Sequence, residues 1–237
     1  MLSTLRNAWK VPELKKRFLW TIFLVTIFRI GIHLPVPGIE TEFLKGMIQS
    51  DSLLGFYDLM SGGAFSRFSI FALSVTPYIN ASIIMQLLTI AIPSLEQLSK
   101  EGENGKKKIQ SITIIVSIAI GVVLAFGSYT MLKGQGATGG FTVVQIVVLI
   151  TALVVGSTFC MWLGDQITVK GFGNGISILI FVNIISQLPT TAKNLAVGKD
   201  SGNIGIVEIG LFVAFVVALL CTAVYFSLAE RKISSHL

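Results

Sequence analysis

The chain has 237 residues, of which 53% are hydrophobic and only 13% are charged. A soluble domain of this size typically carries about 25% charged residues, so the composition excludes an ordinary water-soluble globular protein and indicates helices that face lipid. The net charge of +6 does not indicate nucleic-acid binding, because the basic residues form short clusters between apolar runs. Anionic headgroups and the positive-inside bias favour that pattern.

Apolar runs predict six membrane-spanning helices, preceded by a cytoplasmic amphipathic segment over residues 1–17. A charged, turn-rich loop is expected after the second span, and an external loop is expected at residues 189–203. The basic residues gather on the side that holds the N-terminus, so both ends are predicted to be cytoplasmic. The predicted spans are residues 18–34, 69–92, 109–132, 141–163, 176–188 and 204–228.

Arg29 lies inside the first predicted span, where a charge is costly. Two interpretations stay open: the side chain extends to the nearer headgroups, or it has a partner inside the helix bundle. Cys160 and Cys221 both lie in apolar runs. They are interpreted as small side chains buried in the membrane, and not as a disulfide or a metal site.

Two predicted spans are irregular. Residues 176–188 make a helix of about 20 Å, which is short against a hydrocarbon core of about 30 Å. Pro77 interrupts the span over residues 69–92, which also carries Asn80 and Gln86. Irregular backbone and polar groups persist at membrane depth where they line a cavity or face protein. These two spans are therefore the expected functional centre.

Residues at helical spacing share one face of the second span, and they are Val75, Ile79, Ile83 and Gln86. Ile180 and Ile184 repeat the four-residue step on the fifth span. Such spacing is common in membrane helices, so ordinary packing explains it better when it is taken alone.

Two polar motifs have plain interpretations. Gly171–Ser177 (GFGNGIS) superficially resembles a phosphate-binding loop but lacks the Lys-Ser/Thr pair or the preceding strand, so it predicts a tight turn with Asn174 or Gly175 at the helix start. Glu101–Lys108 (EGENGKKK) is either a solvated loop or a contact for a cytosolic partner. Neither metal-ligand spacing nor a Ser, His and Asp set is present, so we expect no catalytic site and no cofactor.

Six stretches resemble the SecY family, whose members are the central subunits of the bacterial protein-conducting channel. They follow the family's order and cover the chain from near its start to about residue 188, while the next span fits by position alone. The stretches are LPVPGI (Leu34–Ile39), MSGGAFSRFSIFAL (Met60–Leu73), PYINASIIMQLL (Pro77–Leu88), EGENGKKK, MWLGDQIT (Met161–Thr168) and GFGNGISILIF (Gly171–Phe181).

The resemblance implies an all-α polytopic membrane helix bundle. The family has ten spans in two halves related by inverted symmetry, and this chain resembles the first half plus the sixth span. Residues 18–188 would form the five-span half, with a plug helix at 55–69 that blocks the pore from outside. Residues 204–237 would hold the sixth span and the start of a cytoplasmic loop. The other gate helix and the main docking loops would lie outside this chain.

Roles follow from the matching positions. The family's pore constriction is a ring of aliphatic side chains, here Val75, Ile79, Ile180 and Ile184. The plug residues would be Tyr57, Ser61, Gly62, Gly63, Phe65 and Arg67. The lateral gate would use Asn80, Ile83, Gln86 and Leu87. A cytosolic partner would contact Lys106, Lys107 and Lys108.

The implied function is that of a channel subunit in the bacterial inner membrane, and not that of an enzyme. It would move unfolded secretory proteins outward and release membrane segments sideways. The implied partners are SecE- and SecG-like subunits, a SecA-type motor ATPase, the ribosome, signal sequences and lipids, with no nucleic acid bound except through the ribosome. The alternative is a small-solute secondary transporter, which the lack of a deep carboxylate disfavours. A scaffold without a conduit would not explain the plug-like segment.

Overall fold

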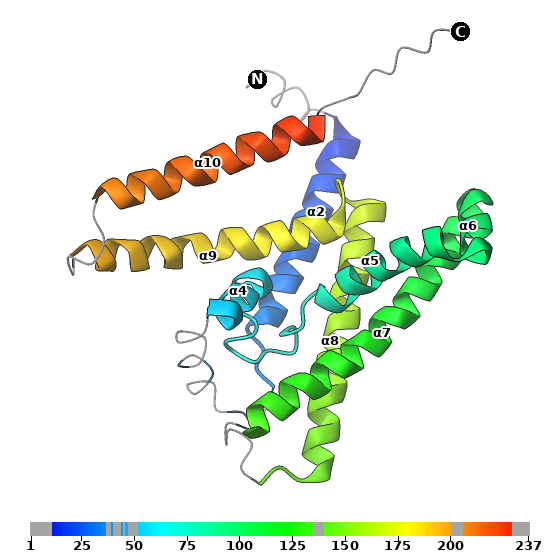
Figure 1. The fold of residues 1–237 in the computed structure, drawn as a ribbon, viewed down its shortest axis with the longest axis horizontal. Coiled ribbons are helices and arrows are strands. Elements are labelled where there is room, and N and C mark those ends of the chain that lie inside the picture. Colours follow the sequence, from blue (N-terminus) through cyan, green and yellow to red (C-terminus); the bar gives the residue numbers. More distant parts are fainter. Residues whose placement is uncertain are drawn as a thin grey trace, which may run out of the picture. The chain divides into compact units, whose positions relative to one another are not determined.

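The computed structural model describes residues 11–36, 39, 44, 46, 52–134, 140–200 and 206–228. Regular structure in these residues is helical apart from one β-bridge between Pro35 and Ser69, so the predicted all-α fold is confirmed. Figure 1 shows the helices in chain order. They are α2 (Pro12–Ile32), α4 (Ser52–Ser61), α5 (Thr76–Ala91), α6 (Pro93–Lys100), α7 (Glu103–Gly134), α8 (Val143–Lys170), α9 (Gly175–Asp200) and α10 (Ile206–Leu228).

The chain divides into two compact units, Met1–Gln187 and Leu188–Leu237. The first unit holds α2 to α8 and the start of α9, and the second holds the rest of α9 and α10. Within α10 the Thr222 hydroxyl donates a hydrogen bond to the Ala218 carbonyl oxygen (2.7 Å), which satisfies a polar group on a mostly apolar helix. The predicted start of a cytoplasmic loop at residues 229–237 lies outside the described residues.

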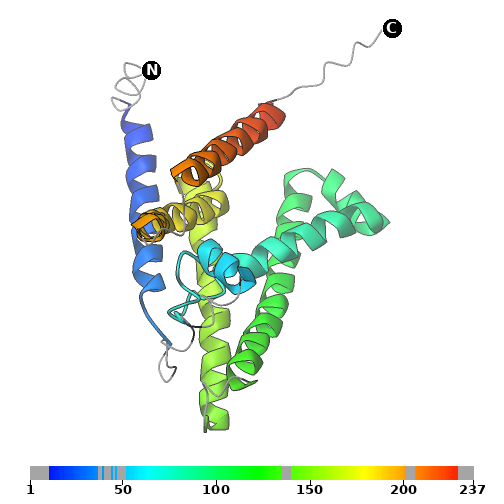
Figure 2. The ribbon, with the colours of Figure 1, turned by 60° about the vertical axis from the view of Figure 1, so that its left-hand side comes forward.

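The long helices α7 and α8 organise the first unit. α7 packs against α5 and α8, and α2 packs against α8; Figure 2 shows α7 running alongside α8. The buried face of α7 carries small residues at four-residue steps, namely Thr113, Ser117, Gly121 and Ala125. Small residues on one face let neighbouring helices approach closely, which is how helices associate when lipid removes the hydrophobic driving force.

By length and composition, α7 and α8 are long and apolar enough to cross a membrane. α5 and α6 make a third span if the pair is taken together, although they meet at a bend of 100°. The bend follows from Pro93, because Ile92 before it takes an extended conformation. The apolar parts of α9 and α10 are shorter, at Gly175–Thr190 and Ala214–Phe226. The short fifth apolar run that the sequence predicts is therefore present.

The predicted bounds of two helices are wrong. α4 ends at Ser61 and does not continue to residue 69, because Gly62 and Gly63 take positive φ of 71° and 83°. Their N–H groups donate to the carbonyl oxygens of Leu59 (3.2 Å) and Asp58 (2.9 Å), which closes the helix in a Schellman motif. The next helix then begins at Thr76 and not at 69. We call residues 62–75, which form successive turns, the inner segment.

Three further boundaries differ from the predicted ones. α2 begins at Pro12, which suits the first helical position, so the end of the amphipathic segment is continuous with the span. Residues 1–10 lie outside the described residues. Pro93–Lys100 is a helix where a loop was expected. α9 continues through Pro189 to Asp200, so most of the expected external loop is helical, because the Ala, Lys and Leu residues that follow favour helix.

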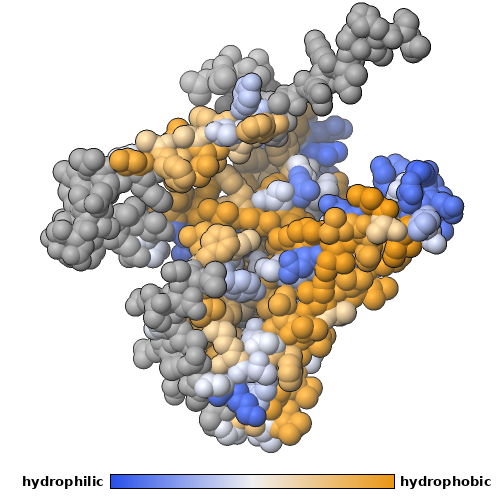
Figure 3. Space-filling model, in the orientation of Figure 1, coloured by the Kyte–Doolittle hydropathy of each residue, from blue (hydrophilic) through white to orange (hydrophobic). Residues whose placement is uncertain are grey.

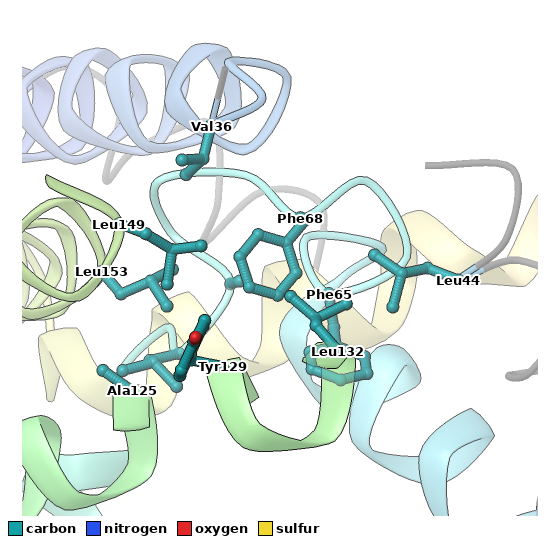
Figure 4. Packing of buried hydrophobic residues seen from close by; sticks show 11 residues of the cluster. Val36, Leu44, Phe65, Phe68, Ala125, Tyr129, Leu132, Leu149 and Leu153 are labelled. Carbon is teal, nitrogen blue, oxygen red and sulfur yellow. The ribbon is translucent and has the colours of Figure 1, made fainter. Parts of the chain in front are cut away.

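Two apolar clusters form the core of the first unit, and Ile70 of the inner segment packs against both. The Phe68 cluster joins the inner segment to α7 and α8. Figure 4 shows the Phe68 ring in its middle, between Leu149 and Phe65. The Val75 cluster joins the inner segment to α2, α8 and α9, and its buried members are Leu24, Phe28, Ile32, Ala64, Phe71, Val75, Cys160, Leu163, Ile167 and Leu179. The inner segment is therefore the centre of the fold.

Candidate functional site

The inner segment lies inside the bundle because two glycines make room for it. A Cβ atom on Gly31 of α2 would overlap the Phe71 ring, and one on Gly156 of α8 would overlap the Ile70 carbonyl oxygen. The segment's backbone is satisfied by the chain that follows α2. Val36 N donates to the Phe68 carbonyl oxygen (2.9 Å), and Ile70 N donates to that of Leu34 (3.0 Å). Pairing of this kind permits non-helical backbone at depth.

The predicted plug residues lie at the junction of α4 and the inner segment. The Asp58 carboxylate accepts a hydrogen bond from Ser66 N (2.7 Å), and the Ser61 hydroxyl accepts one from Phe65 N (3.2 Å). The Tyr57 and Phe65 rings pack edge to face with centroids 5.1 Å apart. Burial raises the pKa of Tyr57 and a hydrogen bond with Thr76 acts against it, so the phenol stays neutral. Arg67 is exposed.

Three of the four predicted ring residues gather around one apolar cluster. Val75 is buried in the Val75 cluster, and Ile79 and Ile180 pack against it from α5 and α9. Ala64, just beyond the two plug glycines, is buried in the same cluster. Ile184 is 40% exposed and is not a member of the cluster. The start of the inner segment and three ring candidates therefore share one apolar cluster.

A polar contact crosses from α9 to the end of α4 and to the inner segment. Asn183 is fully buried, and its Nδ2 donates to the Met60 carbonyl oxygen (3.1 Å) and to the Ser74 hydroxyl (3.4 Å). Arg29 reaches the same region, where its Nη2 donates to the Val182 carbonyl oxygen (3.4 Å). Of the two interpretations of Arg29, the structure supports a partner inside the bundle.

The predicted lateral-gate residues lie on one exposed stretch of α5. Asn80, Ile83, Gln86 and Leu87 are all exposed. The buried residues on the same helix are Pro77, Ala81 and Met85. α5 therefore buries one face in the bundle and leaves the gate candidates unpacked within the described part of the chain.

The three lysines expected to contact a partner lie near the start of α7. Lys106, Lys107 and Lys108 are exposed, and Figure 3 shows hydrophilic residues gathered over α6 and this end of α7. Lys108 Nζ lies 3.9 Å from Glu101 Oε2, an exposed pair that contributes little to stability.

The glycine-rich motif forms the predicted turn between α8 and α9. Gly173 has a φ of 68°, and the Asn174 Oδ1 accepts a hydrogen bond from Ser177 N (3.2 Å) at the start of α9. Beside the turn lies a cavity of about 320 Å³ that also borders Ile79 and Ile83, and its polar lining includes Tyr78, Ser82, Gln110 and Asp165. Among the described residues, no group of three or more His, Cys, Asp or Glu could hold a metal ion.

Sequence reasoning missed Asn183 and the role of Gly31 and Gly156. Asn183 is a lone amide in the middle of an apolar run, and a polar residue at membrane depth signals a buried partner. That signal was available from the sequence. The glycines gave no comparable signal, because glycine is common in membrane helices and its contact partner lies far away in the chain.

Taken together, the apolar helices, the broken α5–α6 pair and the inner segment held among them define a polytopic helical membrane protein with a non-helical segment at its centre. The chain belongs to the SecY family, because the SecY family model matches residues 69–236.

Relatives match along almost the whole chain. The chain is 37% identical over 242 residues to "Protein translocase subunit SecY" of Aquifex aeolicus, covering 98% of this chain and 56% of the relative. It is 39% identical over 240 residues to the subunit of the same name from Pseudomonas aeruginosa, covering 99% of this chain and 53% of the relative. The chain therefore spans about half the length of the curated relatives that it matches.

Solved structures share the fold. One is described as Sec61 in the canine ribosome-channel complex from the endoplasmic reticulum, with a TM-score of 0.59, 19% identity and coverage of 97% of this chain and 53% of that one. Another is described as the structure of a protein conducting channel, with a TM-score of 0.57, 19% identity and coverage of 92% and 51%.

Proposed function

We propose that this chain forms the N-terminal half, with the sixth span, of a protein-translocating channel. In this proposal it conducts unfolded secretory proteins across the membrane and releases transmembrane segments into lipid. The observation that carries the proposal is the inner segment, whose start at Ala64 lies in the same apolar cluster as Val75, the cluster against which Ile79 and Ile180 pack. A non-helical segment held inside a bundle of membrane helices is suited to block a conduit.

The proposed constriction is the ring of Val75, Ile79, Ile180 and Ile184. An apolar ring excludes ions by dewetting, and it deforms around a passing chain because it makes no directional bonds. Val75 is smaller than isoleucine, which loosens the ring slightly. The polar cavity beside Ile79 and Ile83 is suited to hold water on one side of the ring.

The proposed plug consists of α4 and the first part of the inner segment, with Tyr57, Ser61, Gly62, Gly63, Phe65 and Arg67. Two glycines and short turns give it few contacts with lipid. The proposed lateral gate is the exposed stretch of α5 with Asn80, Ile83, Gln86 and Leu87. Its polar residues would be exchanged for contacts with a signal sequence on opening.

The chain's proposed setting is the bacterial inner membrane, with residues 1–17 in the cytoplasm and the region around 189–203 outside. Residues 18–188 would be the five-span half, and 204–237 the sixth span with the start of a cytoplasmic loop. SecE- and SecG-like subunits, signal sequences and lipids are the proposed membrane partners. We propose that it is not an enzyme and that a ribosome or a SecA-type ATPase supplies the energy, with Lys106, Lys107 and Lys108 as a contact.

The comparisons do not support the alternative of a small-solute secondary transporter. The two functions are separated by one experiment. The chain is combined with the C-terminal half of a SecY relative and a SecE-like subunit in proteoliposomes, an assembly that we call the complemented channel. With motor and ATP, a radiolabelled secretory precursor should become protected from protease, and labelled amino acids or sugars should not accumulate. An assembled channel that protects no precursor would contradict the proposal.

A further inference from the structure

A single buried amide joins three parts of the candidate site. Asn183 lies on α9 one turn beyond Ile180, and its side chain is fully buried. Its Nδ2 donates to the Met60 carbonyl oxygen on α4 at 3.1 Å and to the Ser74 hydroxyl on the inner segment at 3.4 Å. We propose that Asn183 is the positioning residue that holds the plug closed against the pore helices, an inference that rests on the proposed function.

The hydrogen bond to Met60 satisfies a backbone carbonyl group at the end of α4 that has no partner within the helix. The last four carbonyl groups of a helix have no partner within it. The Schellman motif at the end of α4 satisfies the carbonyls of Asp58 and Leu59 through the N–H groups of Gly63 and Gly62. The Met60 carbonyl is next in order, and Asn183 supplies its donor. Since a carbonyl oxygen can only accept, this contact fixes which end of the amide faces the plug.

The plug is shaped to receive this side chain. A Cβ atom on Gly62 would lie 2.6 Å from Asn183 Oδ1 and 3.1 Å from Arg29 Nη1, so any larger residue would displace one of them. A Cβ atom on Gly63 would lie 2.9 Å from Nε2 of Gln187, one turn further along α9. The two glycines therefore provide both the positive φ of the turn and the space for the polar face of α9.

The same geometry limits how firmly the plug is held. Asn183 Oδ1 is buried and has no hydrogen-bond partner among the residues that the structure describes, which is a cost in the closed position. Arg67 of the inner segment is close enough to repel Arg29. When the plug moves away and water enters the pore, both ends of the amide gain water partners. The contact therefore favours the closed position only modestly, as a plug that must move requires.

The test uses the complemented channel with Asn183→Leu or Asn183→Val. Neither side chain can donate to the Met60 carbonyl. A hydrogen bond with a net contribution of ordinary size corresponds to roughly a twofold to tenfold change in an equilibrium. Resting ion conductance and export of a precursor with a defective signal sequence should both rise by about that factor. Ser186→Ala is the matched control, because the Ser186 hydroxyl donates within α9, to the Asn183 carbonyl oxygen at 2.6 Å.

A second measurement separates plug position from folding. A Cβ atom on Gly62 would lie 2.9 Å from Asn183 Cγ, so cysteines at 62 and 183 are within disulfide reach. With Cys221→Ser in the same protein, oxidation should lower conductance to the wild-type level or below, and a reductant should raise it again.

The results discriminate between this inference and the proposed function. The inference would be overturned if both Asn183 variants exported the precursor at the wild-type level with unchanged conductance. It would also be overturned if the cysteine pair exported normally but its conductance did not respond to oxidation. Either result would leave the channel proposal standing. A wild-type complemented channel that assembles but exports nothing would overturn the channel proposal and this inference with it.

Discussion

Glycines act in three different ways within this structure, and each way has its own physical test. Gly62 supplies a positive φ at the end of α4. Gly31 admits the Phe71 ring against α2, and Gly156 admits the backbone of Ile70 against α8. Gly127, by contrast, has nothing within 4 Å of where its Cβ would be. Of these four glycines, the first three constrain the inner segment and Gly127 does not. Replacing a glycine with alanine should therefore have opposite effects on stability at different positions.

Gly156→Ala should therefore destabilise the protein. The added methyl overlaps the Ile70 carbonyl oxygen, and backbone cannot yield as a flexible side chain can. Overpacking of this kind costs about 1–3 kcal/mol. Gly127→Ala, in the open, should instead stabilise α7 by about 0.5–1 kcal/mol through helix propensity. Thermal unfolding of the two variants in detergent measures both, and equal effects would mean that the inner segment does not approach α8 at Gly156.

The ring residues give a second prediction at this scale. Ile79→Ser and Ile180→Ser place hydroxyls where the proposed apolar constriction would exclude water, so ions should pass more easily. We expect resting conductance of the complemented channel to rise several-fold. Ile90→Ser is the control, since Ile90 lies on the same helix as Ile79 but is 80% exposed. Conductance equal to that of the control would remove Ile79 and Ile180 from the constriction.

The inner segment is an element whose conformation the sequence patterns did not predict. Its residues are as apolar as those of a span, so the sequence predicts a helix from 69 onward. Phe68 and Ser74 instead take positive φ of 42° and 49°. Contacts with α2, α7 and α8, which come from distant parts of the sequence, decide that conformation. Local propensity is overridden there by packing.

Other elements follow from local signals. The turn between α8 and α9 was predicted from its glycines and from Asn174, because positive φ and helix capping are local requirements. The long apolar runs predicted α7 and α8 for the same reason. The site was only partly predictable. Spacing brings Val75 and Ile79 onto one face, but nothing local shows that Arg29 and Asn183 meet α9 and α4 across more than a hundred residues.

The proposed plug can be removed as a unit. Deleting Tyr57–Arg67 takes away the second half of α4, the hydrogen bond between Met60 and Asn183, and the Ala64 side chain of the Val75 cluster, while leaving α5, α7 and α8 intact. The complemented channel should still insert, and export of precursors with defective signal sequences should rise several-fold because the closed position loses its support. Membrane insertion is checked by protease protection of the helices. Unaltered discrimination between normal and defective signals would count against a plug.

The lysines at the start of α7 lie where the helix dipole disfavours positive charge. Cations near a helix N-terminus are disfavoured by the helix dipole, by about 0.3–1 kcal/mol each at most. Stability therefore does not explain Lys106, Lys107 and Lys108, and the two interpretations of a partner contact and of a solvated region that sets topology are separated by experiment.

Replacing these three lysines with glutamine should leave thermal stability unchanged or slightly higher. Binding of ribosomes or of a SecA-type motor should weaken by roughly threefold to tenfold at low salt and less at high salt. Lys133→Gln, at the other end of α7, is the control. Equal binding by the triple variant and this control would favour the interpretation of a solvated region that only sets topology.

For the whole molecule, the main feature is what the first unit leaves uncovered. The chain spans about half the length of its relatives, and α5 exposes large apolar residues, among them Ile83, Leu87 and Ile90. Beside them stand Asn80 and Gln86, polar groups that lipid alone would not satisfy. In the proposed channel this exposed stretch meets the gate helix of the C-terminal half when closed and a signal sequence when open.

This arrangement predicts the outcome of a crosslinking experiment at Asn80. A photoreactive residue at position 80 of the complemented channel is tested against a secretory precursor stalled during translocation. It should crosslink to the signal sequence, because the incoming signal helix would pack against this exposed polar position on the gate face. Position 90 is the control, since Ile90 is one of the most exposed residues on α5 yet lies ten residues further along the helix. A crosslink from position 80 but not from 90 would place the gate on the face that carries Asn80. Export without a crosslink at either position would leave the channel proposal standing and assign the gate to another face. Equal crosslinks at both positions would show that the precursor meets α5 from lipid and not from the pore.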